Sequence, residues 1–586
     1  MPLSGPCHTA PLLPASQNNR ISSLPFAAPI RAERTESIIV SAEPELAKDL
    51  PSCETRCFFV HLSEPFQQEM NMQSQETDSV TDPSPPQKPR RRVIQNTLFS
   101  ILIKAQSVAF SYTTTRLLLH TMAVEDYGLY SVLFTGILLN FHSVAGLGIP
   151  NLFIRFIPEL AYQSRFRAIA RLFRTATFLQ IASGILLLGI AFIFAPQLAE
   201  LIKFPGREVI LRIFLVGALA YLVQANVMLL LSGLFKQRII FVVIFGYNLI
   251  RLAAIFYVTQ YDYSLQAVTI VEVIALIASL ILYLGAYRQV FHPLVVQDPN
   301  RDEPSPWRRF ARYSGLSCLS EISVILVMEA TDLLLVTGIL GGIVVGYYGV
   351  ADRVTSMVRN LLPNMMLKSV IEPLFFSEYG SSKTGSVNFG FNLLAKTLFF
   401  MALPVGLWLA LMAEPVIVHL FEPRYAQAAR VVSVMALFIA IAGLQMPLAL
   451  TLQNAERIDL IIYSKVAGVL KILIGLWLVP KWGVMAMVWI SGLTALLHNA
   501  ILYTFIVTKL KIRADLVGLL RISINGILSA LLFLLIRGIF TGLIGVFLSV
   551  LCFAAIYLGL NVLHKTFRQD ERMFINKYLA HPLWKF

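Results

Sequence analysis

Long apolar stretches follow one another along the chain from Val93 onward. About fourteen of them are long enough to cross a membrane, since a transmembrane helix needs roughly 20 mainly apolar residues. Helices are expected throughout, because in lipid every backbone N–H and C=O group must find its partner within the protein. The pattern therefore predicts an all-α polytopic membrane protein with about 14 transmembrane helices. The expected helices cover residues 94–119, 127–149, 172–195, 209–233, 239–260, 264–287, 313–338, 342–364, 391–413, 429–452, 459–480, 482–508, 517–537 and 541–563.

Features of the first spans return in the second half of the chain. Asp332–Leu335 echoes Arg116–Leu119, and Gly346–Gly349 echoes Tyr127–Tyr130. Two halves of six spans each have the same orientation in the membrane, so the repeat predicts two six-helix lobes with a pseudo-two-fold axis along the membrane normal. The last two spans are extra C-terminal helices. The predicted divisions are an N-lobe at 93–290, a cytoplasmic linker at 291–312, a C-lobe at 313–508, and helices 13 and 14 with a cytoplasmic tail at 509–586.

Residues 1–92 differ in composition from the rest of the chain. They hold many of the 29 prolines and no apolar run long enough to span a membrane. Such a segment cannot bury enough apolar surface to offset the entropy of ordering it, so a disordered N-terminal extension is predicted. We expect translation to start at Met70 or Met72, which would make residues 1–69 an artefact of the assigned start. Cys53, Cys57 and His61 have a spacing reminiscent of metal ligands but no fourth ligand, so no metal site is predicted.

The charges orient the predicted helices. Charged residues make up only 14% of the chain, whereas a soluble domain has about 25%. With the N-terminus inside, cytoplasmic segments hold about 28 Lys and Arg and outer loops about seven, which is the asymmetry expected of cytoplasmic loops. Both termini are therefore predicted to be cytoplasmic. The net charge of +14 follows from this asymmetry and does not indicate nucleic-acid binding.

The motifs of catalysis are missing from the sequence. There is no GxxxxGK[ST] loop for a nucleotide, no HExxH and no GxSxG. The sequence therefore predicts a transporter rather than an enzyme, without a cofactor, with energy drawn from an ion gradient, the membrane potential or the substrate gradient.

Ionisable residues inside the spans are the candidate functional groups. Each costs about 2.5–3.5 kcal/mol at a helix centre, so such residues usually face the protein interior or water. Arg116 and Asp332 lie near the predicted outer helix ends and Arg359 near an inner end, where a long side chain can instead reach the interface. Helical periodicity places Glu321, Glu329 and Asp332 on one face of span 7. The further candidates are Lys104, Arg251, Glu272, Arg353 and Lys471.

Short motifs resemble a known superfamily. The 6+6+2 plan is similar to the multidrug/oligosaccharidyl-lipid/polysaccharide (MOP) exporters. Tyr127–Tyr130, Gly146–Gly148, Arg155–Glu159 and Gly346–Arg353 resemble its Wzx-type polysaccharide and O-antigen flippases. The resemblance covers about residues 90–565. It implies two lobes around a central cavity in the bacterial inner membrane, and transfer of an undecaprenyl-pyrophosphate-linked oligosaccharide from the inner to the outer leaflet. It also implies membrane lipid, a polysaccharide polymerase and glycosyltransferases as partners.

Roles follow for the charged residues if the resemblance holds. Arg251, Arg353 and Lys471, with Lys104 and Arg359, are predicted to bind the substrate, since Arg forks pair with phosphate oxygens.

Gating or ion coupling is predicted for the remaining charged positions. Arg116 and Asp332 occupy matching repeat positions and are expected to pair when the outer side is closed. The other predicted members of this group are Glu329, Glu321 and Glu272.

Three alternatives remain at this point. The acidic face of span 7 would suit an ion-coupled antiporter for drugs or other cations. A lipid II flippase of the same superfamily is another alternative, and a membrane scaffold for glycosyltransferases that transports nothing is a third.

Overall fold

The structure is a computed structural model that describes residues 89–261, 264–298, 307–368, 371–372, 375, 384–455 and 457–578. All regular elements in these residues are helices. The prediction of an all-α polytopic protein is therefore confirmed. The first helix begins at Pro89, ahead of the predicted boundary at Val93. The rest of the predicted N-terminal extension and the expected start at Met70 or Met72 lie outside the described residues.

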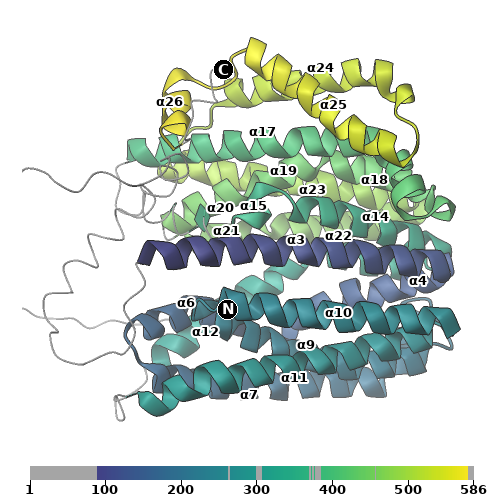
Figure 1. The fold of residues 1–586 in the computed structure, drawn as a ribbon, viewed down its shortest axis with the longest axis vertical. Coiled ribbons are helices and arrows are strands. Elements are labelled where there is room, and N and C mark those ends of the chain that lie inside the picture. Colours follow the sequence, from purple (N-terminus) through teal and green to yellow (C-terminus); the bar gives the residue numbers. More distant parts are fainter. Residues whose placement is uncertain are drawn as a thin grey trace, which may run out of the picture. The chain divides into compact units, whose positions relative to one another are not determined.

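The first half of the chain supplies the helices of the predicted N-lobe. They are α3 (Pro89–Thr121), α4 (Val124–Ser131), η1 (Val132–Ile137), α5 (Leu138–Ala145), α6 (Ile149–Tyr162), α7 (Phe166–Ile193), α8 (Ala195–Leu201), α9 (Glu208–Gly233), α10 (Gln237–Tyr261) and α11 (Leu265–Gln297). The long helices lie side by side, with α3 between α10 and the helices of the second half (Figure 1).

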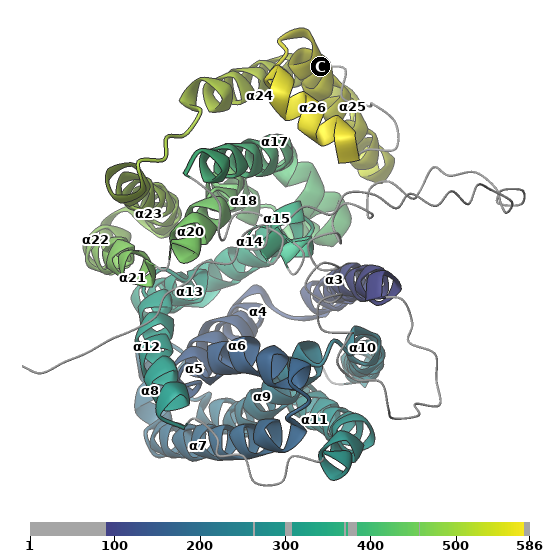
Figure 2. The same cartoon turned by 90° about the vertical axis from the view of Figure 1, so that its left-hand side faces the viewer.

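The second half supplies a similar set and two more long helices. They are α12 (Trp307–Ile325), α13 (Glu329–Ile339), α14 (Gly342–Asn360), α15 (Pro363–Met366), α17 (Thr384–Val416), η2 (Ile417–Phe421), η3 (Pro423–Tyr425), α18 (Ala428–Leu437), α19 (Ile439–Gly443), α20 (Gln445–Asn454), α21 (Ile458–Ser464), α22 (Val466–Trp482), α23 (Val484–Phe505), η4 (Ile506–Leu510), α24 (Leu516–Ile536), η5 (Arg537–Ile539), α25 (Gly542–Leu563) and α26 (Gln569–Tyr578). The last three α-helices lie outside α17 (Figure 2).

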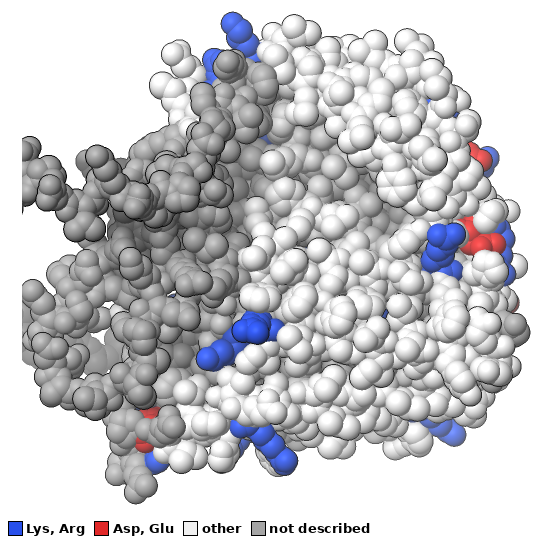
Figure 3. Space-filling model, viewed as in Figure 1, with Lys and Arg blue, Asp and Glu red and all other residues white. Residues whose placement is uncertain are grey.

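Each predicted span falls on helical residues, but among the described residues fewer than fourteen helices are long and apolar enough to cross a membrane. In the described part of the chain ten helices are long and apolar enough to cross a membrane, or up to twelve if each of two bent pairs is one span. The remaining two predicted spans fall on α3 and on α14, which carries Asp352, Arg353 and Arg359. The count of fourteen therefore stays a prediction. Charged side chains are few and scattered on the face drawn in Figure 3, as expected for lipid-facing helices.

Two breaks shape the helices at the junction of the halves. α12 and α13 meet at a 47° bend. The chain between α5 and α6 turns at Leu147 and Gly148, both with positive φ. A Cβ on Gly148 would lie 2.6 Å from the Ser314 carbonyl oxygen and 2.5 Å from the Cys318 nitrogen, so only glycine allows this approach of α6 to α12.

The two halves meet through the repeated glycine turns. A Cβ on Gly128 of α4 would lie 2.8 Å from the nitrogen of Gly346 on α14. A Cβ on Gly346 would lie 2.1 Å from the carbonyl oxygen of Val124. One turn further, a Cβ on Gly349 would lie 2.6 Å from Ser131 Oγ, so this glycine makes room for a side chain of α4. The backbones of α4 and α14 are therefore in direct contact, where any side chain would push them apart.

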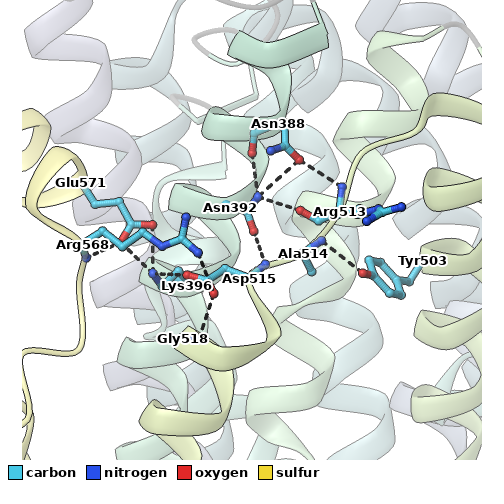
Figure 4. A network of polar contacts seen from close by, with 10 residues as sticks. All are labelled: Asn388, Asn392, Lys396, Tyr503, Arg513, Ala514, Asp515, Gly518, Arg568 and Glu571. Carbon is cyan, nitrogen blue, oxygen red and sulfur yellow. Dashed lines mark hydrogen bonds and ion pairs between the residues drawn. The ribbon is translucent and has the colours of Figure 1, made fainter.

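A buried ionic network, which we call the Lys396 network, joins the C-terminal helices to α17. It consists of Lys396, Asp515, Arg568 and Glu571 (Figure 4). Lys396 Nζ lies 2.9 Å from Asp515 Oδ2 and 2.7 Å from Glu571 Oε2, and the lysine is only 1% exposed. Asp515 also caps α24 by accepting from the Gly518 amide, and Glu571 accepts from the Arg568 amide at the start of α26.

Candidate functional site

A cavity of about 450 Å³ lies among α13, α14, α18, α19 and α23, with Thr135 of η1 and Leu139 of α5 on its wall. Ligand pockets in proteins are usually about 300–1,000 Å³, so this cavity is large enough to hold a small ligand or part of a larger one. Four of its lining residues are charged, namely Glu329, Asp332, Asp352 and Arg359. All four come from the two consecutive helices α13 and α14.

Asp332 forms a buried ion pair with Lys471 of α22. Both side chains are 1% exposed, and Ser491 Oγ of α23 donates to Asp332 Oδ2 at 2.6 Å. Lys471 Nζ also donates to the Met328 carbonyl oxygen at 3.0 Å, at the bend between α12 and α13. The lysine therefore satisfies a backbone group near the bend, which a lipid-embedded protein must pair internally.

Arg359 and Glu329 form a bidentate ion pair at the edge of the same cavity. Arg359 Nη2 also donates to Ser356 Oγ at 2.9 Å. Asp352 is buried and lines the cavity, and its carboxylate has no hydrogen-bond or ion-pair partner among the described residues. With Lys471, the cavity region thus has three carboxylates facing two cationic groups, although Lys471 and Arg359 are predicted to bind an anionic substrate.

A second cluster is built around Arg251 of α10. Its Nε lies 2.6 Å from Glu272 Oε2 on α11, and its Nη2 lies 2.5 Å from Glu272 Oε1. Tyr130 OH of α4 lies 2.9 Å from the same Nη2 and donates to Glu272 Oε1 at 2.7 Å. Glu272 is 2% exposed and Arg251 11% exposed, so the bidentate pair is largely withdrawn from solvent.

Arg353 of α14 brings positive charge from the other half toward this cluster. Its Nε donates to Thr115 Oγ1 of α3 at 3.3 Å. α14 also packs against α4, which supplies Tyr130 to the Arg251 cluster. The structure therefore brings Arg251 and Arg353 into one neighbourhood and places the third predicted partner, Lys471, against Asp332 instead.

Other predicted positions are apart from these two clusters. Arg116 is exposed, and its Nη1 lies 3.4 Å from Tyr112 OH. It does not pair with Asp332 in this structure, because that carboxylate is bound by Lys471. Lys104 is exposed and has no ion-pair partner among the described residues.

The prediction that the span at 313–338 has one acidic face is wrong. Glu321 lies on α12 and accepts from Asn151 Nδ2 at 2.8 Å, whereas Glu329 and Asp332 lie on α13 beyond the bend. The periodicity of a straight helix does not continue through a 47° bend.

Sequence reasoning missed two functional candidates. Asp352 belongs to the Gly346–Arg353 motif, which resembles the flippase family. It is nevertheless missing from the charged candidates of the predicted helix at 342–364. Lys396 lies inside span 9, where the cost of an unpaired charge should have marked it. For both residues the signal was present in the sequence.

Solved structures of other proteins have similar folds. A lipid II flippase MurJ in an inward closed conformation aligns with a TM-score of 0.61 at 14% identity, covering 80% of this chain and 98% of that chain. An inward-facing multidrug resistance MATE family transporter of the MOP superfamily aligns with a TM-score of 0.57 at 12% identity, covering 71% and 99%. The chain thus has the fold of MOP-superfamily transporters and flippases. The predicted resemblance to this superfamily is confirmed at the level of the fold.

A family model narrows the comparison further. Residues 93–378 match the model of the polysaccharide biosynthesis protein family. The match begins at the predicted start of the N-lobe and extends into the second half of the chain. No curated protein matches the sequence. The Wzx-type branch stays a prediction.

Proposed function

We propose that the protein is a flippase that moves an undecaprenyl-pyrophosphate-linked oligosaccharide from the inner to the outer leaflet of the bacterial inner membrane, with both termini cytoplasmic. The observation that carries the proposal is the match of residues 93–378 to the polysaccharide biosynthesis protein family. A polysaccharide polymerase and glycosyltransferases are the partners proposed with it.

The geometry supports an unequal division of roles between the two neighbouring arginines. Glu272 binds one edge of the Arg251 guanidinium, through Nε and Nη2, so this charge is largely compensated before any substrate arrives. Among the described residues Arg353 is bound only through Nε, to a neutral hydroxyl, which leaves its terminal nitrogens for a phosphate oxygen. Arg353 is therefore the primary phosphate ligand in the proposal. Arg251 contributes positive potential and holds α10 to α11 and α4.

Transport would follow from rocking of the two halves around this neighbourhood. Arg353 is on α14 and Thr115 on α3, so their contact links the second half to the first. A substrate anion that binds Arg353 would compete for this side chain and thereby alter the contact between the halves. A substrate shifts the populations of the two arrangements only if it binds one of them more tightly than the other.

An ion-coupled antiporter for cations is the second candidate. It is favoured by the cavity of about 450 Å³, whose wall includes the Asp352 carboxylate, without a hydrogen-bond or ion-pair partner among the described residues, and the charged pairs Glu329–Arg359 and Asp332–Lys471. A lipid II flippase and a scaffold that transports nothing are further alternatives. No contact among the described residues specifically favours either of them.

The test compares Arg353→Gln and Asp352→Asn in cells whose surface polysaccharide depends on this gene. Arg353→Gln should reduce surface polysaccharide and accumulate the lipid-linked oligosaccharide inside, and Arg353→Glu should be more severe, because it adds repulsion to lost attraction. Arg238→Gln removes an exposed charge from α10 as the control. Full export by Arg353→Gln at normal expression, together with a loss of cation efflux in Asp352→Asn, would refute the flippase proposal and favour the antiporter.

A further inference from the structure

A second pocket, which we call the arginine pocket, lies between α6 and α12, away from the cavity described above. Its volume is about 530 Å³, and it shares no lining residue with the first cavity. Arg155 and Phe156 of α6 form one side, and Arg308, Arg309 and Arg312 of α12 form the other, with Tyr313 and Leu316 completing the lining.

The arginine pocket has more positive charge than its neighbours compensate. Glu159 binds Arg309 in a bidentate manner, with Oε1 at 2.9 Å and Oε2 at 3.3 Å, and reaches Arg155 at 4.0 Å. Among the described residues neither Arg308 nor Arg312 has a hydrogen-bond or ion-pair partner. Within the described part of the chain, four guanidinium groups therefore surround one carboxylate, which leaves a local excess of positive charge that an anion would relieve.

The guanidinium of Arg309 is fixed in place. Its carbon lies 4.9 Å from the centroid of the Phe156 ring, and Glu159 holds its terminal nitrogens. Phe156 is buried and packs edge-on against Phe310 and Tyr313, so the floor of the pocket is part of the core rather than a mobile surface. An ordered guanidinium loses less entropy on binding than a free one.

The surroundings of the arginine pocket indicate an anion carried by a lipid. Trp307, 41% exposed, begins α12, where an interfacial aromatic is expected. Leu316, Leu319 and Ile322 follow at three-residue spacing and are 60%, 56% and 46% exposed. A headgroup among the arginines would thus have an apolar helix face beside it for acyl chains. A soluble phosphate would make no use of that face.

We propose that the arginine pocket binds the headgroup of an anionic phospholipid from the leaflet at this end of the helices, with its acyl chains along Leu316, Leu319 and Ile322. Guanidinium forks match phosphate oxygens, and basic pockets between membrane helices on the cytoplasmic side commonly hold anionic headgroups. The bound lipid would bridge α12 to α6 and so hold the first part of the bent α12–α13 segment against the first half. This proposal goes beyond the proposed function and does not depend on which substrate is transported.

The test uses the full chain in a neutral detergent, titrated with phosphatidylglycerol or with phosphatidylcholine, and native mass spectrometry to measure the fraction with bound lipid. Wild type should bind phosphatidylglycerol more tightly than phosphatidylcholine. Arg308→Gln/Arg312→Gln should weaken phosphatidylglycerol binding roughly 30-fold, since two basic side chains near the headgroup are lost. The control Arg174→Gln/Arg238→Gln removes the same charge from exposed positions on α7 and α10 and should leave binding unchanged.

Three results would overturn the proposal. They are equal weakening by the control pair, equal affinity of wild type for phosphatidylcholine, and displacement of the lipid by millimolar inorganic phosphate, which would indicate a site for soluble anions. Arg308→Lys/Arg312→Lys covers the case in which the Gln pair does not fold. This variant keeps both charges but lacks the guanidinium forks. Its affinity for phosphatidylglycerol should therefore fall between that of wild type and that expected for the Gln pair. If it does not prefer phosphatidylglycerol to phosphatidylcholine, the lipid site is equally refuted.

Discussion

Replacing Lys396 by Met should release α26 from the rest of the protein. The wild-type Lys396 network contains two cations, Lys396 and Arg568, and two anions, Asp515 and Glu571, so it is neutral as a whole. In Lys396→Met, Asp515 keeps its partner Arg568 at 3.1 Å, but the charge of Glu571, whose side chain is 4% exposed, loses its ion-pair partner. Removing one partner of a buried ion pair costs about 3–5 kcal/mol, because the other charge stays buried without compensation.

This free-energy cost predicts how much the population with α26 detached increases. Since each 1.36 kcal/mol changes an equilibrium constant tenfold, the population with α26 detached should rise by at least roughly 100-fold. Limited trypsin digestion of the purified protein measures this population through cleavage at Arg568 and Arg572, because cleavage follows the open form when opening and closing are fast. Lys396→Met/Glu571→Gln restores neutrality and should return cleavage close to the wild-type rate.

A control variant and two contradicting results test whether the loss of the Lys396 charge causes the faster cleavage. Arg521→Gln removes an exposed charge from α24 that has no ion-pair partner among the described residues, and it should leave cleavage unchanged. If Lys396→Met is cleaved at the wild-type rate, or if the double variant is cleaved as fast as the single one, then the Lys396 network does not hold α26 in place.

Three further predictions concern the other features. Arg251→Gln should lower the thermal stability of the detergent-solubilised protein, and Arg251→Gln/Glu272→Gln should recover part of it. A double-mutant cycle of unfolding midpoints would measure the coupling between the two residues. Additive effects of the two substitutions would mean that the pair is not coupled. Gly346→Ala should be more damaging than Gly128→Ala, because its Cβ would meet a carbonyl oxygen at 2.1 Å; equal expression and stability of the two variants would contradict this packing. Burial alone would raise the pKa of Asp515, but hydrogen bonds from Lys396 and from the Gly518 amide lower it below its ordinary value. The stability that Asp515 contributes should therefore be complete above its ordinary pKa and be lost as pH falls through the lowered one, a dependence that Asp515→Asn should remove from protease-resistance profiles.

The helices could be predicted from the sequence, whereas their bends and partners could not. Apolar length and the need to pair every backbone group locate each span, and the predicted ranges all fall on helical residues. The bend before Met328 has no such signal, since Leu326 and Val327 precede it and neither proline nor glycine marks the place. Because the bend separates Glu321 from Glu329, the prediction of one acidic face failed there.

The partners of the buried charges required the structure. The cost of a charge in lipid predicts that Arg251 and Lys471 must be compensated, but periodicity says nothing about which helix lies opposite. Lys471 was expected to face a substrate anion and is bound to Asp332 instead. Glu272 was assigned to ion coupling and neutralises Arg251. The sequence thus locates these charges within the spans but not the partners that they have in the structure, and their roles in transport stay predictions.

The contact of Gly128 with Gly346 has a consequence for how the two halves can change over evolutionary time. The two glycines are encoded by separate codons, so each can be substituted while the other is kept. Gly128 is the less confined of the two, since its Cβ would lie 2.8 Å from the nearest atom, whereas a Cβ on Gly346 would lie 2.1 Å from the Val124 carbonyl oxygen. A small side chain is therefore less costly on α4 than on α14, as long as Gly346 stays a glycine and leaves room for it.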